Sequence, residues 1–396
     1  MAMLSGIKVL DFTHFLSGPY ATMMLADLGA EVVKVEDPAK PDEARSVGPY
    51  FQRGQSLYFA ALNPGKRSIA LSLSDPRAEP IIARLAGQSD VVIDNFKPGV
   101  TRRLGLDHER LTRINKGLVT CSITGYGETG PLTKAPAYDY SIQAAAGVMS
   151  MAGEPDGPPE KAGVSYVDHS GGLSAALAVC AGLIQVQRTG VGRHLEVALF
   201  DIQVSMLSYL ASWQINAGYE PVRQANSAHP SLVPAQNFAV KDGWVSVFVG
   251  HDDMWRRLVA ALHDPRLHDE RFTSGEGRRE HRVEIIDILS GLLATMSSAE
   301  CAKLLSDHGV PCTRVATLSE ALSHPQVRDR GLVRHVLHPS YGAYDYVGGP
   351  LPGASTGQVG PAPRLGEDTR NILTELGYSQ LEIDKLVAAG VAEPTG

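Results

Sequence analysis

Cysteine is scarce in this sequence, with only four among 396 residues. Cys121, Cys180, Cys301 and Cys312 form no Cys-x-x-Cys pair and no dense disulfide framework. The first residues also lack a basic segment followed by a long apolar stretch, which is the pattern of a secretory signal. We therefore expect free, buried thiols and a cytoplasmic location.

The sequence also lacks a long uncharged apolar run and an excess of positive charge. The most apolar run, at 173–184, has twelve residues, whereas a membrane-spanning helix needs about 20. We interpret it as a buried helix and predict no membrane association. With 36 basic and 43 acidic residues the net charge is −7, which argues against nucleic-acid partners. A small basic pocket for a phosphorylated ligand is still compatible with this charge.

Short β-rich runs alternate with helical segments over the first 130 residues, which predicts βαβ units. Such units give an α/β fold with a mostly parallel sheet covered on both faces. The predicted strands are 7–12, 31–35, 68–73, 90–94, 118–123 and 193–198. Helices are expected after Gly18-Pro19 and Asp75-Pro76, because proline suits the first turn of a helix. Further helices are expected at 140–149, 170–188 and 201–214.

A different pattern begins near residue 218 and predicts a small α+β domain at 225–320. The strands 237–240 and 244–248 flank an Asp242-Gly243 turn, which is typical of a β-hairpin. Ser297 and Glu300 form a capping box at the start of a helix, and Ser379 and Glu382 form another. The remaining segments are 1–217 and 325–396.

The sequence contains several patterns that resemble catalytic or ligand-binding motifs. Residues 125–130 match G-x-G-x-x-G after a strand, but Pro131 and Pro136 follow instead of a helix. A dinucleotide fingerprint must open a helix, so we interpret these residues as a glycine-rich loop. The sequence contains no H-E-x-x-H motif. His335 and His338 lie on an expected strand, so we predict no metal site.

Asp168 precedes Gly171-Gly172 and a nearly uncharged helix, and it has two interpretations. It is either an N-cap, whose carboxylate accepts backbone N–H bonds, or a carboxylate held in a dry site as a nucleophile or base. Spacing alone favours the cap, because caps are far commoner than catalytic residues. The neighbouring His169 is not expected to pair with it, since adjacent side chains do not face each other.

Motifs spread in order over nearly the whole chain resemble the class III CoA-transferases, the family of formyl-CoA transferase and carnitine CoA-transferase. Residues 63–69 match N-x-x-K-R-S-I, and residues 94–99 match E/D-N-F-x-P-G. The other matching segments are 9–36, 123–131, 188–192, 309–312 and 365–369. The resemblance implies a Rossmann-like large domain built from both chain ends, with 325–396 returning to it, and an interlocked homodimer.

The resemblance places the family's catalytic aspartate on Asp168. It implies that this carboxylate attacks the thioester of a donor acyl-CoA, giving an acyl anhydride and then an aspartyl thioester. A small carboxylic acid would accept the CoA. Coenzyme A and acyl-CoA would thus be substrates, with no permanently bound cofactor.

The resemblance also implies a CoA-binding groove formed by Leu71, Ser72, Asn95, Phe96, Lys97 and Arg103. Cationic groups there would meet phosphate oxygens, and Phe96 would supply an apolar wall. Leu16 and Asp37 stand where formyl-CoA transferase carries glutamine and arginine. The resemblance therefore does not extend to formyl-CoA and oxalate as substrates, and the donor and the acceptor stay open.

The sequence leaves two alternatives to CoA transfer open. α-Methylacyl-CoA racemase shares the superfamily and uses a histidine in a His-Asp pair, where this chain has Tyr138 and Asp139. Tyrosine has an ordinary pKa near 10 and suits a neutral-pH base poorly, so transfer is favoured over racemisation. Tyr138 and Asp139 are candidate active-site lining, although packing or capping would explain them equally well. The other alternative is a non-catalytic CoA-binding protein.

Overall fold

The structure is a computed structural model, and it describes residues 2–351 and 359–395. Residues 1, 352–358 and 396, which belong to the predicted end segments, lie outside the described residues. The chain divides into two compact units. The first comprises residues 2–146, 164–206, 325–351 and 359–395, and the second comprises 147–163 and 207–324. The sequence predicts that 147–163 and 207–217 belong to segment 1–217, whereas the structure places both in the second unit.

The first unit is built on a six-stranded sheet in the order β5-β2-β1-β6-β7-β8, with every neighbouring pair parallel. In chain order the strands stand third, second, first, fourth, fifth and sixth, which is the Rossmann arrangement. The expected α/β fold with a mostly parallel sheet is therefore confirmed. The strands are β1 (Lys8–Phe12), β2 (Glu31–Glu36), β5 (Lys66–Ala70), β6 (Val91–Asp94), β7 (Val119–Thr124) and β8 (His194–Ala198).

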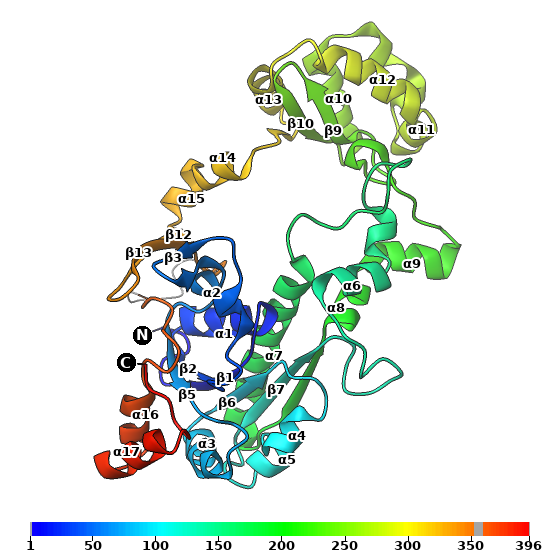
Figure 1. Cartoon of the computed structure of the whole chain (residues 1–396). Coiled ribbons are helices and arrows are strands. Elements are labelled where there is room, and N and C mark those ends of the chain that lie inside the picture. Colours follow the sequence, from blue (N-terminus) through cyan, green and yellow to red (C-terminus); the bar gives the residue numbers. More distant parts are fainter. Residues whose placement is uncertain (1, 352–358, 396) are drawn as a thin grey trace. The chain divides into compact units, whose positions relative to one another are not determined.

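Apolar side chains alternate along the strands, so the sheet has a core on each face. Val9 and Val32 point toward α1 (Ser17–Asp27) and α7 (Tyr166–Thr189) on one face. Leu10 points to the opposite core, which includes residues of α3 (Glu79–Gly87), α16 (Thr369–Glu375) and α17 (Gln380–Ala388). The last two helices, red in Figure 1, bring the C-terminal part of the chain back to the first unit.

Helix α7 is long and apolar enough, by length and composition alone, to cross a membrane. Its composition also has a packing explanation. Gly171, Gly172, Ala175 and Ala176 are buried, and a Cβ on Gly172 would lie 2.6 Å from the Ser17 carbonyl oxygen. Small residues therefore let α7 pack directly against the start of α1.

The second unit has its own core around a three-stranded antiparallel sheet in the order β11-β10-β9. The predicted hairpin is present as β9 (Ala235–Val240) and β10 (Gly243–Phe248), and β11 is Cys312–Arg314.

The helix expected at 201–214 is instead two helices, α8 (Leu199–Met206) and α9 (Ser208–Ala217). The chain breaks there because Ser208 has a φ of 45°, which a regular helix does not allow.

The first unit contains further helices and strands. They are β3 (Phe51–Gln52), β4 (Gln55–Ser56), α2 (Leu57–Leu62), α4 (Val100–Leu104), α5 (His108–Leu111), α6 (Asp139–Ala145), α15 (Pro325–Asp329), β12 (Val333–His338) and β13 (Gly342–Val347). The second unit adds α10 (Asp252–Leu262), α11 (Gly275–Glu280), α12 (Arg282–Leu293), α13 (Ser298–Asp307) and α14 (Leu318–Leu322). Both predicted capping boxes are present, at the starts of α13 and α17.

A pair of opposite charges is fully buried on β1 and β5. Asp11 Oδ2 lies 3.0 Å from Lys66 Nζ, and neither side chain is exposed. Thr13 and Thr22 donate three further hydrogen bonds to the Asp11 carboxylate. Burial raises the pKa of Asp11, but the two lysines Lys66 and Lys34 and these donors outweigh it and lower the value to about 2. The carboxylate is therefore ionised and fully hydrogen-bonded.

A second buried pair fixes the loop that follows β1. Lys34 Nζ lies 2.9 Å from Asp42 Oδ2 and donates a hydrogen bond to the carbonyl oxygen of Thr13. Asp42 Oδ1 accepts a hydrogen bond from the Phe15 N–H at 2.9 Å. Phe15 has a φ of 63°, a conformation that a non-glycine residue keeps only when its surroundings enforce it. The β1–α1 loop is thus tied to buried charges.

Replacing Asp11 by Asn should destabilise the first unit by roughly 3–5 kcal/mol, because Lys66 would stay buried without its counter-charge. Because the pKa of Asp11 is lowered from 3.8 to about 2, its contribution is present above the ordinary pKa and is lost as the pH falls through about 2. Urea unfolding followed by far-UV circular dichroism measures the loss.

The three tryptophans, Trp213, Trp244 and Trp255, all lie in the second unit, so their fluorescence serves as an internal comparator. The expected result is a larger shift by circular dichroism than by fluorescence. An Asp11→Asn variant that unfolds within ~1 kcal/mol of the wild type would contradict the assigned role of the pair.

Candidate active site at the carboxyl ends of the parallel strands

The site lies where the strand order reverses, between β1 and β6. In open parallel sheets ligands bind in the crevice outside the carboxyl ends of the strands at such a point. A cavity of about 1010 Å³ is found there in the first unit, at the upper end of the roughly 300–1,000 Å³ typical of small-molecule sites. Its lining follows β1, β2, β5, β6 and β7, and it includes residues of α2, α6 and α7.

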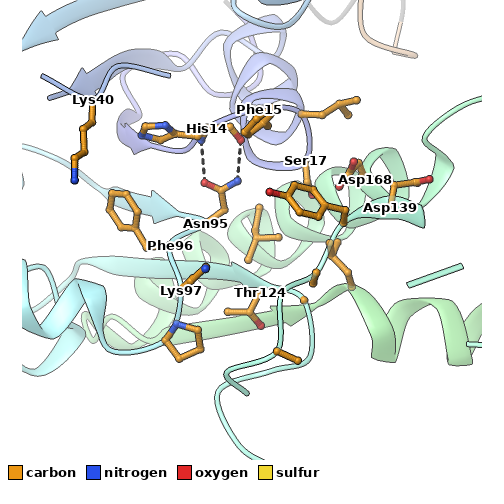
Figure 2. A pocket seen from close by; sticks show the side chains of 18 of the residues that line it. His14, Phe15, Ser17, Lys40, Asn95, Phe96, Lys97, Thr124, Asp139 and Asp168 are labelled. Atoms are coloured by element: carbon orange, nitrogen blue, oxygen red, sulfur yellow. Dashed lines mark hydrogen bonds between the residues drawn. The ribbon is translucent and has the colours of Figure 1, made fainter. Parts of the chain in front are cut away.

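The loops after β1 and β6 are joined by a reciprocal pair of hydrogen bonds. The His14 N–H donates to Asn95 Oδ1 at 2.9 Å, and Asn95 Nδ2 donates to the His14 carbonyl oxygen at 2.8 Å (Figure 2). The rings of His14 and Phe96 lie 6.0 Å apart, and the Phe96 N–H donates to Asp94 Oδ1 at 3.1 Å. Asn95 and Phe96, both predicted from the sequence, are therefore held as one wall of the cavity.

The cavity lining carries unpaired positive charge. Lys40, Lys97, Arg103 and Lys134 line the cavity, and none of the four forms an ion pair with a carboxylate of the described residues. Figure 2 shows Lys40 and Lys97 on the side of Phe96, away from Asp139 and Asp168. Unpaired cations converging on a cavity suit the phosphate groups of a ligand. The predicted Lys97 and Arg103 both lie in this lining.

Asp37 also lines the cavity, but its carboxylate is occupied by the backbone. It accepts hydrogen bonds from the Ala39 N–H at 2.9 Å and the Leu73 N–H at 3.2 Å. Asp37 therefore links the loops after β2 and β5. Both oxygens of Asp37 accept hydrogen bonds from the backbone, so this carboxylate holds in place the two loops that form this part of the cavity.

The predicted contribution of Leu71 and Ser72 to the groove needs correction. Leu71 is 0% exposed and belongs to the core on the α3 face of the sheet. The N–H of Ser72 donates to the Val391 carbonyl oxygen at 2.9 Å. The chain is held there by the returning C-terminal segment and reaches the cavity two residues later, so Leu73 and Ser74 line it instead.

Asp168 is the third residue of α7 and faces the cavity. The N-cap of α7 is Ser165, so the interpretation of Asp168 as an N-cap is wrong. None of the described residues donates a hydrogen bond to its carboxylate. Burial, with the negative charge of Asp139 adding to it, raises the pKa of Asp168 to about 6. The Asp168 carboxylate is therefore largely shielded from water and accepts no hydrogen bond from the described residues.

Asp139 positions the start of α7 from a different helix. Its Oδ2 accepts a hydrogen bond from the Val167 N–H at 3.0 Å, and its Oδ1 accepts one from Gln143 Nε2 at 2.6 Å. The N–H of Val167 is one of those that an α-helix leaves unpaired at its start. Asp139 therefore caps α7 from α6. Tyr138 lines the same cavity but is 68% exposed.

Tyr58 completes the carboxylate end of the cavity and was missed by the sequence analysis. It comes from α2 and lines the cavity. Burial raises the pKa of Tyr58 to about 12, and the negative charge of Asp168 adds to this shift. Its hydroxyl therefore keeps its proton at neutral pH beside Asp168. Its apolar helical segment offers no pattern that separates Tyr58 from an ordinary packing residue.

Other motifs singled out earlier are structural. Gly127 and Gly130 both have a φ of 90°, and the next helix begins only at Asp139, as expected for a glycine-rich loop. His169 is not among the residues that line the cavity, and its Nδ1 lies 2.8 Å from the Ser165 carbonyl oxygen. Within residues 2–351 and 359–395, no group of three or more His, Cys, Asp or Glu side chains is placed to hold a metal ion.

Comparison with known proteins agrees with this geometry. Residues 4–369 match CoA-transferase family III. A succinyl-CoA:glutarate CoA-transferase from Mus musculus is 37% identical over 398 residues, covering 99% of this chain and 91% of its own. A succinate–glutarate CoA-transferase from Agrobacterium fabrum is 37% identical, with 94% and 95% covered. A CaiB/BaiF family crystal structure from Brucella suis has a TM-score of 0.82 at 34% identity, covering 95% of this chain and 99% of that one. The chain belongs to CoA-transferase family III and is a CoA-transferase.

Proposed function

We propose that this enzyme moves CoA between succinyl-CoA and glutarate or a dicarboxylic acid of similar size, with Asp168 as the covalent nucleophile. The observation that carries the proposal is the placement of Asp168. A carboxylate without hydrogen-bond donors lies at one end of a cavity, and unpaired cations line the other end. The names of two 37% identical relatives support the choice of acids.

The cavity suits a long ligand with phosphates at one end and a thioester at the other. Lys40, Lys97 and Arg103 would bind the phosphate groups of CoA, and Phe96 would pack against its apolar part. The thioester then reaches Asp168. Binding energy gained at the remote nucleotide is available for the reacting carbon, which explains why the cations lie far from the chemistry.

The proposed reaction is a sequence of acyl exchanges. An Asp168 oxygen attacks the thioester carbon, forming an acyl anhydride and releasing CoA thiolate. The thiolate attacks the aspartyl carbonyl, which gives an aspartyl–CoA thioester and frees the donor acid. The acceptor carboxylate then attacks the aspartyl–CoA thioester, which forms a second anhydride and releases CoA thiolate. The thiolate attacks the acyl carbonyl of the acceptor, which gives the new acyl-CoA and frees the Asp168 carboxylate. No step changes an oxidation state or needs a net proton, so water exclusion is the main demand on the site.

Asp168→Asn and Asp168→Ala should abolish transfer, with turnover falling by on the order of 10⁴-fold or more, because neither side chain can form the anhydride. CoA should still bind with a Kd close to that of the wild type, since the phosphate-binding cations are untouched. Mass spectrometry of CoA esters formed from succinyl-CoA and a panel of acids measures transfer, and calorimetry measures binding.

Asp201→Asn, an exposed carboxylate of α8 outside the cavity, is the matched control and should keep full activity. Substantial transfer by either Asp168 variant would remove the nucleophile assignment. Deuterium entering the α-carbon of an acyl-CoA without any acceptor acid would favour the racemase alternative. A wild-type protein that binds CoA but does not transfer it between acids would favour the alternative of a non-catalytic CoA-binding protein.

The pH profile gives a separate test. Because only the ionised carboxylate attacks, kcat/KM should rise with pH through the pKa of Asp168, which is about 6. Asp139→Asn should move this rise to lower pH, since the repulsion is gone while the burial stays. Asn keeps an oxygen for the Val167 N–H, so the start of α7 is preserved.

Asp94 also titrates near 6, because burial raises its pKa, but Asp139 is not among the causes of that shift. A profile that shifts in the Asp139→Asn variant therefore reports Asp168. An unshifted profile would assign the rise to another group.

We also propose that the enzyme is a homodimer, as the family resemblance implies. Leu173, Leu177 and Ile184 follow one another at helical spacing on α7 and are exposed in the single chain. An exposed apolar stripe of this kind is typical of an interaction surface. The stripe lies on α7, which packs against one face of the sheet. We propose that a second copy of the chain covers it.

Leu177→Glu should shift the molecular mass in solution from that of two chains toward one, measured by light scattering after size exclusion. Leu177 is 73% exposed, so the change does not disturb the core of one chain. Leu381→Glu, at an exposed apolar residue of α17, is the control. An unchanged mass in the Leu177→Glu variant would exclude this stripe as the interface.

We propose a cytoplasmic location as well. Cys301 and Cys312 lie with their Sγ atoms 3.7 Å apart and are not bonded. Two thiols this close together stay free in a reducing compartment, so their free state supports a cytoplasmic location.

A further inference from the structure

Ser17 presents a buried hydroxyl that has no partner. It is 5% exposed, and its Oγ forms no hydrogen bond within the described part of the chain. Ser17 nevertheless lines the cavity that contains Asp168 (Figure 2). A buried polar group without a partner costs free energy, so a hydroxyl kept at this position needs a reason that the folded chain alone does not supply.

The hydroxyl lies at the start of α1, an 11-residue helix. Among the described residues, the N–H groups of Ser17 and Gly18 have no hydrogen-bond partner, as expected for the first turn of a helix. This end of a helix carries partial positive charge and favours anions. The unpartnered Oγ and the positive helix end therefore favour the same kind of ligand.

Close packing brings this hydroxyl beside Asp168. A Cβ on Gly171 would lie 2.8 Å from Ser17 Oγ, so the hydroxyl touches α7 at Gly171. Asp168 is three residues earlier on α7, and residues at this spacing are neighbours on one face of a helix. Side chains on a helix also lean toward its N-terminus. Asp168 and Ser17 therefore border the same small volume.

We propose that Ser17 is a further catalytic residue, whose hydroxyl donates a hydrogen bond to the oxyanion formed at the acyl carbon. This inference rests on the proposed nucleophilic role of Asp168. As the Asp168 oxygen bonds to the thioester carbon, the carbonyl electron pair moves to its oxygen. Ser17 Oγ–H and the first N–H groups of α1 hold that negative charge. The electron pair then returns, the C–S bond breaks, and CoA leaves as thiolate.

The role explains why the hydroxyl is unpartnered in the free enzyme. A donor already paired with the protein would have to give up that bond in each cycle. A preorganised free donor stabilises developing charge without such reorganisation. The position also serves both halves of the reaction, because each acyl exchange forms an oxyanion next to the same Asp168 carboxylate.

Ser17→Ala should lower kcat for CoA transfer by about 10²-fold, the effect typical of removing one oxyanion donor. The Kd for CoA and the far-UV spectrum should stay unchanged, since the hydroxyl bonds to nothing in the free enzyme. Ser17→Cys keeps the shape with a weaker S–H donor and should give an intermediate rate. Ser89→Ala is the control: this buried serine outside the cavity donates to the Leu85 carbonyl oxygen and should leave kcat unchanged.

Three results overturn the inference: a kcat within twofold of the wild type in Ser17→Ala, a Kd for CoA that weakens as much as kcat falls, or a Ser17→Cys rate no higher than that of Ser17→Ala. The parent proposal fails separately, when Asp168→Asn still transfers CoA. An inactive Asp168→Asn together with a fully active Ser17→Ala removes only the role of Ser17.

Discussion

The buried ion pairs under α1 are the constraint on which the site depends. Asp11, Lys66, Lys34 and Asp42 occupy positions in and beside the sheet that would otherwise be apolar. Replacing such pairs by apolar residues is often neutral or stabilising, so their presence is poorly explained by stability. Their geometric effect is clearer. They bind the backbone of the β1–α1 loop through Thr13 and Phe15, and that loop ends at Ser17.

The position of α1 in turn depends on α7. Glycines at 171 and 172 allow the start of α1 to touch α7 one turn beyond Asp168. Asp139 caps the same helix from α6. The start of α7 is therefore held from two sides by groups distant in sequence, while the Asp168 carboxylate itself is left without donors. This division of roles keeps the carboxylate nucleophilic, because hydrogen bonds to it would lower its pKa and its reactivity.

Charge is distributed unequally along the cavity. The chain as a whole is acidic, with a net charge of −7, yet cations without carboxylate partners line the end that suits phosphates. The opposite end combines two carboxylates, Asp139 and Asp168, with the neutral hydroxyl of Tyr58. A ligand negatively charged at one end only is oriented by this difference, which places its uncharged thioester against Asp168.

The alternation of apolar residues and helix-start signals predicted the parallel sheet, the hairpin and both capping boxes, because these features depend on residues near one another in the chain. Asn95, Phe96 and Lys97 were expected near a ligand only because of the family resemblance, and the structure places them after β6, at the edge of the sheet where the cavity lies. Local pattern could not tell whether Asp168 caps its helix, nor which residues after β5 reach the cavity. Those outcomes depend on Ser165, on Val391 and on the distant α6. Tyr58 and the Ser17 hydroxyl gain their significance only from neighbours that folding brings to them, since burial and a missing hydrogen-bond partner are properties of tertiary packing.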